Sequence, residues 1–389
     1  MTRALKTVPV ALPWLGEPEA DAARRAILSG WVTQGPEVAA FEREFAHAVG
    51  AAHACAVSSC TTALHLALAA VGVARDDEVV TVSHSFIATA NAIQYCGAMP
   101  VFVDVQLDTL NMDPALVDAA ITPRTKAILA VHQLGMPCDL AGILQVGRRR
   151  GLPVIEDAAC AIGSQIRWDG VWQPIGRPHA DIACFSFHPR KLVTTGDGGM
   201  LTTSSADLDA RFRLLRQHGM SVPDAVRHAS PQVIFEDYPV VGFNYRMTDI
   251  QAAIGREQLK RLPAIVSRRR ELAARYHDRL ARIGGVIVPA EPEWARSNWQ
   301  SYAIRLAAGL DQRTIMQRML DAGVSTRRGV MNAHREAAYP PGTWRAAGPL
   351  DRSEQAQNTS IVLPLYHQMT EEDQDRVIEA LSAAIREEP

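Results

Sequence analysis

The chain has 389 residues, of which 47% are hydrophobic, and a formal net charge of −2 at pH 7. This length allows a large core with a major and a minor domain. The near-neutral charge without a basic stripe argues against a nucleic-acid partner. No apolar run approaches membrane-spanning length, and the N-terminus lacks the pattern of a secretion signal, so we expect a cytoplasmic protein without a membrane partner.

Short apolar strands alternate with helical patterns from about Ala54 to Thr203. The expected strands are Val79–Val82, Val101–Val105, Ala127–Val131, Val154–Asp157, Ile182–Phe187 and Met200–Thr203. Helical patterns fall between several of them, at Ala88–Tyr95, Pro114–Ala120 and Leu140–Arg149. This alternation predicts an α/β fold with a mostly parallel sheet flanked by helices.

The C-terminal third has a different pattern. A helix is predicted over Thr248–Arg261, and a long helix over Pro263–Ile283 leads away from the sheet. The remainder mixes a strand with helices, at Ser301–Leu306, Asp311–Ala322 and Glu371–Arg386. We therefore expect a large domain over residues 1–262, including the N-terminal segment, and a small α+β domain over 263–389.

The cysteines and the arginine runs have ordinary interpretations. The six cysteines all fall in the first half of the chain and show no CxxC spacing. Free cysteine behaves as a small hydrophobe, so we expect a reduced protein with no disulfide framework and no metal site. The runs Arg148–Arg150 and Arg268–Arg270 are predicted to be solvated helix faces.

Lysine is scarce, and one lysine stands in an unusual place. The chain has only four, Lys6, Lys126, Lys191 and Lys260. Lys191 alone follows a buried-looking strand and precedes a glycine turn, 196–199. Arginine is never deprotonated in proteins, whereas a partly buried lysine can lose its proton and attack a carbonyl. Lys191 is therefore a candidate Schiff-base lysine, with a surface lysine in a turn as the alternative.

Three further segments carry chemistry. Ser59-Cys60-Thr61 opens a strong helical pattern, which offers an anion site or simply a helix cap at Ser59 or Thr61. Asp157 ends a strand where ligands of parallel sheets bind, so it is a partner for a charged ring nitrogen or a turn acid. Phe86 follows another strand, where it stacks on a flat cofactor or belongs to the core.

An anion site, an aromatic face, an acid for a ring nitrogen and an amine nucleophile are the parts of a pyridoxal phosphate site. The order and wording of these segments resemble the DegT/DnrJ/EryC1/StrS sugar aminotransferases, which are fold-type I pyridoxal-phosphate enzymes. The resemblance runs from about Trp31 to the C-terminus. It includes Gly35-Pro36, 59–61, 85–89, 156–159, 186–191, 196–199, His218-Gly219, 242–247, 251–253 and 363–365.

The resemblance implies a role for each matching residue. It implies pyridoxal phosphate as cofactor, with Lys191 as the Schiff-base lysine and later proton shuttle. Asp157 becomes the partner of the pyridinium nitrogen, and Phe86 the stacking aromatic. The implied phosphate ligands are Ser186, Thr61, the backbone N–H of Cys60, and Asn244 from the neighbouring subunit. The last of these implies a homodimer with shared active sites.

Three residues depart from the family pattern. Cys60 stands where the family usually has Gly before the phosphate-binding Thr, which narrows the turn but leaves the N–H available. Cys160 stands where the family has Gln, His or Glu, and is a weaker partner for the cofactor's phenolic oxygen. Arg190 replaces the usual Thr, and its charge is expected to favour the neutral amine of Lys191.

The substrate contacts are less sharply indicated. The family takes an amino group from glutamate or glutamine and delivers it to the keto group of a nucleotide-linked sugar. Arg327 or Arg328 is a candidate for binding a diphosphate or the donor's carboxylate, and His334 for contacting a hexose hydroxyl. A solvated loop is the alternative for each. His188 lines the pocket or serves packing.

Three other functions fit the same pattern. A sugar dehydratase of this family has His in place of the lysine, and Lys191 argues against it. A non-catalytic, cofactor-binding regulator of the same fold is opposed by the complete set Lys191, Asp157 and Ser186. A keto-cyclitol aminotransferase, of the scyllo-inosose type, remains an open alternative.

Overall fold

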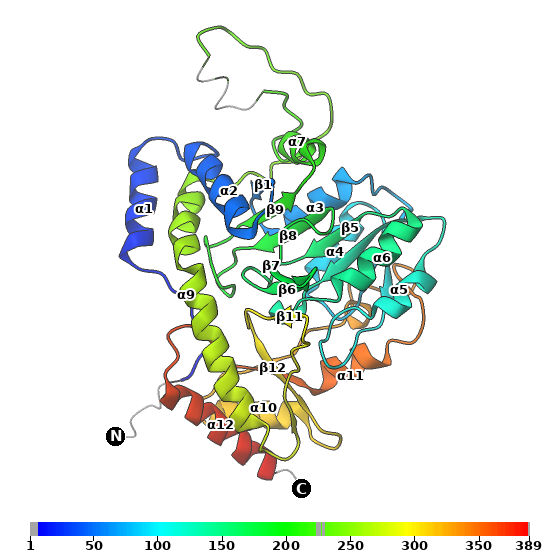
Figure 1. The fold of residues 1–389 in the computed structure, drawn as a ribbon, viewed down its shortest axis with the longest axis vertical. Coiled ribbons are helices and arrows are strands. Elements are labelled where there is room, and N and C mark those ends of the chain that lie inside the picture. Colours follow the sequence, from blue (N-terminus) through cyan, green and yellow to red (C-terminus); the bar gives the residue numbers. More distant parts are fainter. Residues whose placement is uncertain (1–6, 223–226, 228–229, 388–389) are drawn as a thin grey trace.

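The computed structural model describes residues 7–222, 227 and 230–387. An eight-stranded sheet forms the centre of its larger part (Figure 1). The spatial order is β1 (His53–Val57), β9 (Gly199–Thr203), β8 (Ile182–Ser186), β5 (Val154–Asp157), β4 (Thr125–Val131), β2 (Glu78–Val82), β3 (Met99–Val103) and β14 (Arg345–Ala346). Only β9 is antiparallel to its neighbours; every other neighbouring pair is parallel. The mostly parallel sheet is confirmed.

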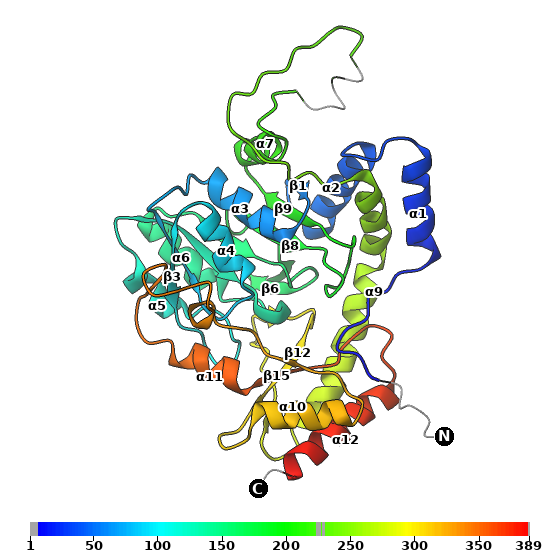
Figure 2. The ribbon, with the colours of Figure 1, turned by 180° about the vertical axis from the view of Figure 1, so that it is seen from behind.

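Helices cover both faces of this sheet (Figures 1 and 2). One face packs against α2 (Pro36–Val49), α5 (Pro114–Ala120), α6 (Leu140–Arg150) and the first half of α9 (Asp249–Leu280). The other face packs against α3 (Cys60–Ala70), α4 (Ala88–Tyr95) and α7 (Ala206–Leu215). Successive strand residues such as Val79 and Val80 enter opposite cores, as the period of two along a strand requires. Helix α1 (Glu17–Leu28) packs outside α9.

A smaller layer lies at the other end of α9 (Figure 1). Its antiparallel sheet has the order β10 (Val286–Ile287), β12 (Tyr302–Leu306), β15 (Ser360–Leu363) and β13 (Arg327–Arg328). Three helices belong to this C-terminal part: α10 (Gln312–Asp321), α11 (Asp351–Thr359) and α12 (Glu371–Arg386). The chain also forms two short 3-10 helices, η1 (Gln133–Gly135) and η2 (Ala333–Arg335). A third sheet has the order β11 (Ala295–Arg296), β6 (Gln165–Trp168) and β7 (Val171–Pro174).

The two helices predicted around Pro263 are one helix, α9, and this corrects the sequence analysis. Thr248 caps it as expected, since its side chain accepts from the N–H of Gln251. Proline lacks the N–H for one helical bond and normally ends or kinks a helix. Here Leu262 and Val266 pack into the large core while Leu272 packs into the C-terminal core, so tertiary packing holds both sides of Pro263 in place.

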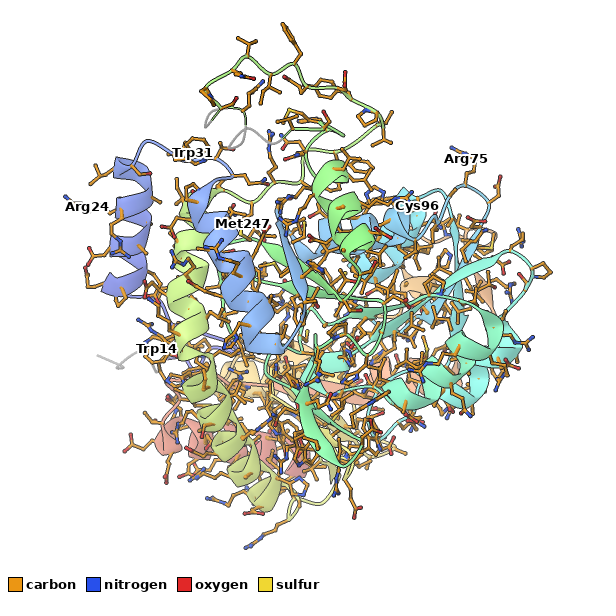
Figure 3. All side chains as sticks on the ribbon, turned by 45° about the horizontal axis from the view of Figure 1, so that its top comes forward. Trp14, Arg24, Trp31, Arg75, Cys96 and Met247 are labelled. Atoms are coloured by element: carbon orange, nitrogen blue, oxygen red, sulfur yellow. The ribbon has the colours of Figure 1, made fainter. Side chains whose placement is uncertain are left out.

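Segments near both termini cross between the two parts. Val8 is buried in the C-terminal core and bridges Val324, although it precedes the large sheet in sequence. Conversely, β14 comes from the C-terminal third and extends the large sheet beside β3. Trp14, labelled in Figure 3, lies beside α9, where the guanidinium of Arg261 packs 4.5 Å from its ring centre. The division at residues 262 and 263 falls inside α9 and stays a prediction.

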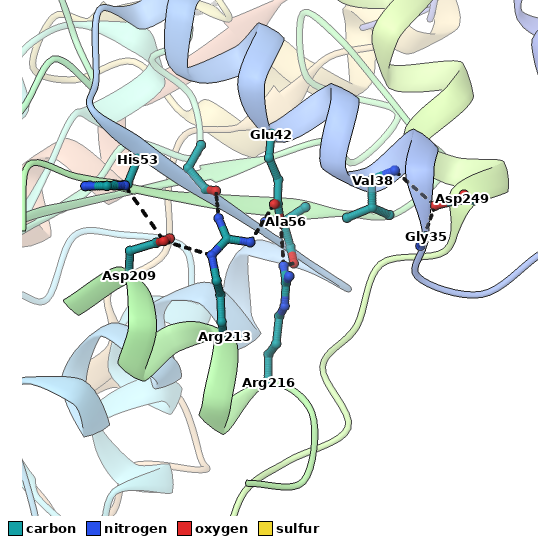
Figure 4. A network of polar contacts seen from close by, with 10 residues as sticks. Gly35, Val38, Glu42, His53, Ala56, Asp209, Arg213, Arg216 and Asp249 are labelled. Carbon is teal, nitrogen blue, oxygen red and sulfur yellow. Dashed lines mark hydrogen bonds and ion pairs between the residues drawn. The ribbon is translucent and has the colours of Figure 1, made fainter. Parts of the chain in front are cut away.

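Two buried acids tie distant segments together (Figure 4). Asp249 accepts from the N–H groups of Gly35, Glu37 and Val38, so it caps the start of α2. Asp249 and Gly35 are 214 residues apart in the sequence. Glu42 accepts from Arg213 and Arg216, and also from the N–H of Ala56. These contacts hold α2 against β1, α7 and α9.

The arginine runs differ from each other. Arg149 and Arg150 pair with Asp118 on a half-exposed surface, as expected of a solvated face. Arg269 is buried and donates to the backbone oxygens of Trp299, Gln300 and Leu365, so the prediction of a solvated face is wrong there.

All six cysteines are free, and four of them are buried. In the described part of the chain, no helix has both the length and the apolar character of a membrane span. The same residues contain no group of three His, Cys, Asp or Glu placed to hold a metal ion.

Candidate active site

A cavity of ≈ 320 Å³ opens where β4, β5 and β8 end. The carboxyl ends of parallel strands are the usual ligand site of such sheets. Most of the candidate residues line it: Cys60, Thr61, Phe86, Asp157, Cys160, Ser186, His188, Lys191, Arg327 and Arg328. Asn244 and His334 do not. The fold thus brings ten residues from five distant segments to one place.

The start of α3 forms one wall of the cavity. Ser59 is the N-cap: its hydroxyl accepts from the N–H of Thr62, and the Thr62 side chain accepts from the N–H of Ser59. The N–H groups of Cys60 and Thr61, in the first turn, have no intrahelical acceptor. Gly199 packs so closely that a Cβ there would lie 2.5 Å from the Ser59 carbonyl carbon. The turn therefore packs directly against the backbone of β9, and its N–H donors lie at the positive end of the helix.

Asp157 is buried at the end of β5. Its Oδ2 accepts from Thr89 Oγ1 at 2.7 Å, and its Oδ1 accepts from the N–H of Ala159 at 3.2 Å. A carboxylate has about four acceptor sites, so capacity remains for a donor in the cavity. The neighbouring Glu156 is not a rival for the cavity, because it does not line it and instead contacts His132 at 2.8 Å.

Phe86 forms an apolar wall rather than part of the core. Its side chain is 56% exposed, although the neighbouring Ser85 and Thr89 are buried. An exposed aromatic ring in a cavity wall offers a face for stacking. The alternative of a core phenylalanine is therefore excluded by the exposure of this side chain.

Lys191 lies in the loop after β8, half-buried, with its N–H bonded to the carbonyl of His188. Its Nζ donates to Cys160 Sγ at 3.0 Å. Burial lowers the pKa of the Lys191 amine, but Cys160, Cys60 and Asp157 together outweigh burial and raise it. The sequence analysis expected the charge of Arg190 to favour the neutral amine, whereas the net shift of the Lys191 pKa is upward.

Ser186 and His188 complete the loop before Lys191. Ser186 is buried at the end of β8, and its hydroxyl lies 3.4 Å from the N–H of His188. His188 Nδ1 accepts from the N–H of Arg190. Burial, followed by the charges of Arg190 and Lys191, lowers the pKa of His188, so this ring is neutral at pH 7.

The C-terminal part also contributes to the lining of the cavity. Arg327 and Arg328 form β13 and are exposed at the cavity, and Arg328 pairs with Glu336 at 3.2 Å. His334 is held elsewhere: Nδ1 lies 2.6 Å from Ser83 Oγ and Nε2 lies 3.1 Å from Glu354 Oε1. A hexose contact by His334 would replace one of these bonds, and that role stays a prediction.

Asn244 is exposed and lies outside the cavity of its own chain. It pairs with Gln217 in an isolated bridge, beside the edge where Arg246 bridges Val57 of β1. Its predicted contact with the phosphate in a neighbouring subunit also stays a prediction.

The cavity fits a phosphorylated aromatic aldehyde. Free helix N–H groups and hydroxyls suit a phosphate, the exposed Phe86 ring suits a flat ring, and the buried Asp157 has lone pairs to spare. The amine of Lys191, which lines the same cavity, is a nucleophile of the kind that reacts with an aldehyde.

The sequence analysis missed Thr89, whose hydroxyl donates to Asp157. The available signal was its spacing of four residues from Ser85 in a motif that matches the family.

Comparison with known proteins gives consistent matches. The profile of the DegT/DnrJ/EryC1/StrS aminotransferase family matches residues 13–382. The chain is 37% identical over 383 residues to the spore coat polysaccharide biosynthesis protein SpsC of Bacillus subtilis (strain 168), covering 97% of each. It is 40% identical over 388 residues to GDP-perosamine synthase of Caulobacter vibrioides, covering 98% of this chain and 99% of that protein.

A solved structure agrees with these sequence matches. The PLP-form of the putative sugar aminotransferase Spr1654 from Streptococcus pneumoniae has a TM-score of 0.89 and 27% identity. The match covers 98% of this chain and 100% of that chain.

Proposed function

The chain belongs to the DegT/DnrJ/EryC1/StrS aminotransferase family, and on this premise we propose that it moves an amino group from glutamate or glutamine to the keto group of a nucleotide-linked sugar. The observation that carries the proposal is the meeting of the Lys191 amine, the Asp157 carboxylate and the exposed Phe86 ring in one cavity. GDP-perosamine synthase, one of the relatives, supports the choice of a nucleotide-linked sugar.

The chain's own residues divide the work of holding a cofactor. When bound, pyridoxal phosphate supplies an aldehyde that takes up amines and a ring that stabilises negative charge on carbon. Lys191 would attach it, Asp157 would hold the ring nitrogen's proton, and Phe86 would stack on the ring. The first-turn N–H groups of α3 and the hydroxyls of Thr61 and Ser186 would bind the phosphate.

The same lysine is placed to move a proton. Its amine is a basic group in the wall of the cavity, and the raised pKa keeps a proton on the free amine at neutral pH. General acid–base transfer needs the group within hydrogen-bond reach of the reacting carbon, and a lysine that first holds the cofactor satisfies this by position.

Arginines at the mouth of the cavity suit an anionic substrate. Arg190 and Arg327 both line it, and burial followed by the charge of Arg327 lowers the pKa of Arg190. Arginine recognises phosphate and carboxylate groups through paired donors. These arginines would therefore bind a diphosphate or the donor's carboxylate.

The test presents purified protein, loaded with the cofactor, with glutamate or glutamine and a panel of acceptors. The panel holds nucleotide-linked keto-sugars, free keto-sugars and keto-cyclitols, and mass spectrometry detects the aminated product. We expect amination of a nucleotide-linked sugar, and none by Lys191→Ala. Amination of keto-cyclitols alone would select the cyclitol enzyme. A loaded protein that aminates nothing would contradict the proposal and favour a regulator.

A further inference from the structure

The segment Ser85–Thr89 matches the family over its whole length, yet only Phe86 has a role so far. Ser85 and Thr89 lie four residues apart, on either side of the point where α4 begins. The N–H of Thr89 bonds to the carbonyl of Phe86, so one turn positions all three side chains. The hydroxyl of Thr89 points to Asp157 at the end of β5, and the hydroxyl of Ser85 points to that of Thr89.

These hydroxyls form a chain that ends on Asp157. Thr89 Oγ1 lies 2.7 Å from Asp157 Oδ2, and Ser85 Oγ lies 2.7 Å from Thr89 Oγ1. The exposed fractions are 4% for Ser85, 1% for Thr89 and 6% for Asp157. A buried hydrogen bond to a charged group is among the stronger ones in proteins.

The direction of this chain follows from counting protons. An ionised carboxylate only accepts hydrogen bonds, so the hydroxyl of Thr89 donates its one proton to Asp157. Thr89 Oγ1 can then only accept from Ser85, so the hydroxyl of Ser85 donates to Thr89. Ser85 lines the cavity and therefore offers it lone pairs only.

We propose that Thr89 is a positioning residue that fixes the Asp157 carboxylate, charged and oriented, for the ring nitrogen of the cofactor, and that Ser85 orients Thr89. The inference rests on the proposed function, because it assigns a partner to Asp157 in the same site. The hydroxyl of Thr89 and the N–H of Ala159 hold both oxygens of the acid without neutralising it. A lysine or arginine there would compete with the positive ring nitrogen.

The test compares two cofactors on protein without cofactor: pyridoxal phosphate and its 1-deaza analogue, which has carbon in place of the ring nitrogen. The ratio of their dissociation constants measures the contact between Asp157 and the nitrogen, since phosphate, stacking and lysine contacts are common to both. Asp157→Ala gives the ratio without any carboxylate. We expect the ratio of the two dissociation constants, which favours the nitrogen-containing ring in the wild type, to fall about tenfold in Thr89→Val.

Matched variants separate positioning from folding. Thr89→Ser keeps the hydroxyl and should restore the preference, and Ser85→Ala should lose a smaller part of it. A purely structural role would weaken both cofactors equally, so an unchanged ratio in Thr89→Val would overturn the proposal. If Thr89→Val does not fold, an unchanged ratio in Ser85→Ala, together with loss of preference in Thr89→Ser, overturns it instead. Failure of the wild-type protein to bind pyridoxal phosphate at all would count against the proposed function.

Discussion

The Nζ of Lys191 lies 3.0 Å from the Sγ of Cys160, so a lysine amine and a thiol meet inside the cavity. The two residues are 31 positions apart and come from the loops after β8 and β5. Sulfur is a weak acceptor compared with the amide, carboxylate or imidazole that the family resemblance led us to expect. The contact nonetheless affects the charge state of the lysine.

Removing this thiol should change the pH at which Lys191 reacts. Burial lowers the pKa of Lys191, whereas Cys160 is the leading cause of the net rise. An amine attacks only when unprotonated, so Cys160→Ala should lower the pKa and shift the pH profile of cofactor attachment to lower pH. Stopped-flow absorbance with cofactor-free protein measures it. Cys96→Ala, at the half-buried end of α4 (Figure 3), is the control and should leave the profile unchanged.

Lys191 should carry the cofactor covalently. Purified protein should show a visible absorption band that borohydride fixes irreversibly, and tryptic mapping should place the reduced cofactor on Lys191. Lys191→Ala should lack the band, whereas Lys260→Ala, which removes an exposed lysine paired with Glu257, should keep it. Finding the reduced cofactor on another lysine would refute the assignment.

Asp157→Asn should retain the cofactor and lose most transamination. An amide cannot stabilise positive charge on the ring nitrogen, and loss of a fixed electrostatic stabiliser slows a reaction by about a hundredfold or more. Cofactor content by absorbance and turnover by product mass are measured on the same sample. Near-normal turnover would place the nitrogen partner elsewhere, and Glu156→Gln would then be the variant to examine.

Asn244 should act in the site of a partner subunit. It is exposed and outside its own cavity, and an isologous dimer places two equivalent sites across the axis. Lys191→Ala and Asn244→Ala homodimers should each be weak, whereas mixed dimers should regain one site with both native residues. Activity after proven subunit exchange is the measurement. No recovery would mean that Asn244 acts within its own chain or is dispensable.

Glu42→Gln should destabilise the fold by about 3 to 5 kcal/mol, because it leaves the buried Arg216 without its charged partner. Burial raises the pKa of Glu42, but Arg216 and Arg213 outweigh burial and lower it below 4.5. Its stabilisation is thus present above pH 4.5 and is lost as the pH falls through the lowered value. Urea unfolding at pH 7 and at acid pH measures both effects.

A surface pair provides the control for this prediction. Glu44 pairs with Arg256 on a partly exposed surface, and Glu44→Gln should cost less than about 1 kcal/mol. If the two variants lost equal stability, the buried network around Glu42 would not be the reason.

Local chemistry and apolar patterning in the sequence were sufficient to find six of the eight strands of the large sheet and to single out residues that the fold gathers in one cavity. Short apolar runs marked these strands, because a strand covered by helices on both faces is buried along its whole length. Lys191 stood out because the chain uses arginine almost everywhere else, and Asp157 and Phe86 because each follows a strand at the sheet edge where ligands bind. Membership of the family, inferred from these ordered motifs, is confirmed.

The tertiary structure alone decided what depends on partners far along the chain. Pro263 predicted a helix end, but cores on either side keep α9 continuous. Arg269 was predicted to face solvent, yet it is buried and donates to backbone carbonyls up to 96 residues away in the sequence. Thr89 meets Asp157 across 68 residues, and the spacing of Ser85 and Thr89 in the sequence does not identify this partner. The sequence by itself determined the chemistry that each segment carries, whereas only packing decided which side chains meet, because contact free energies act between positions that local periodicity does not connect.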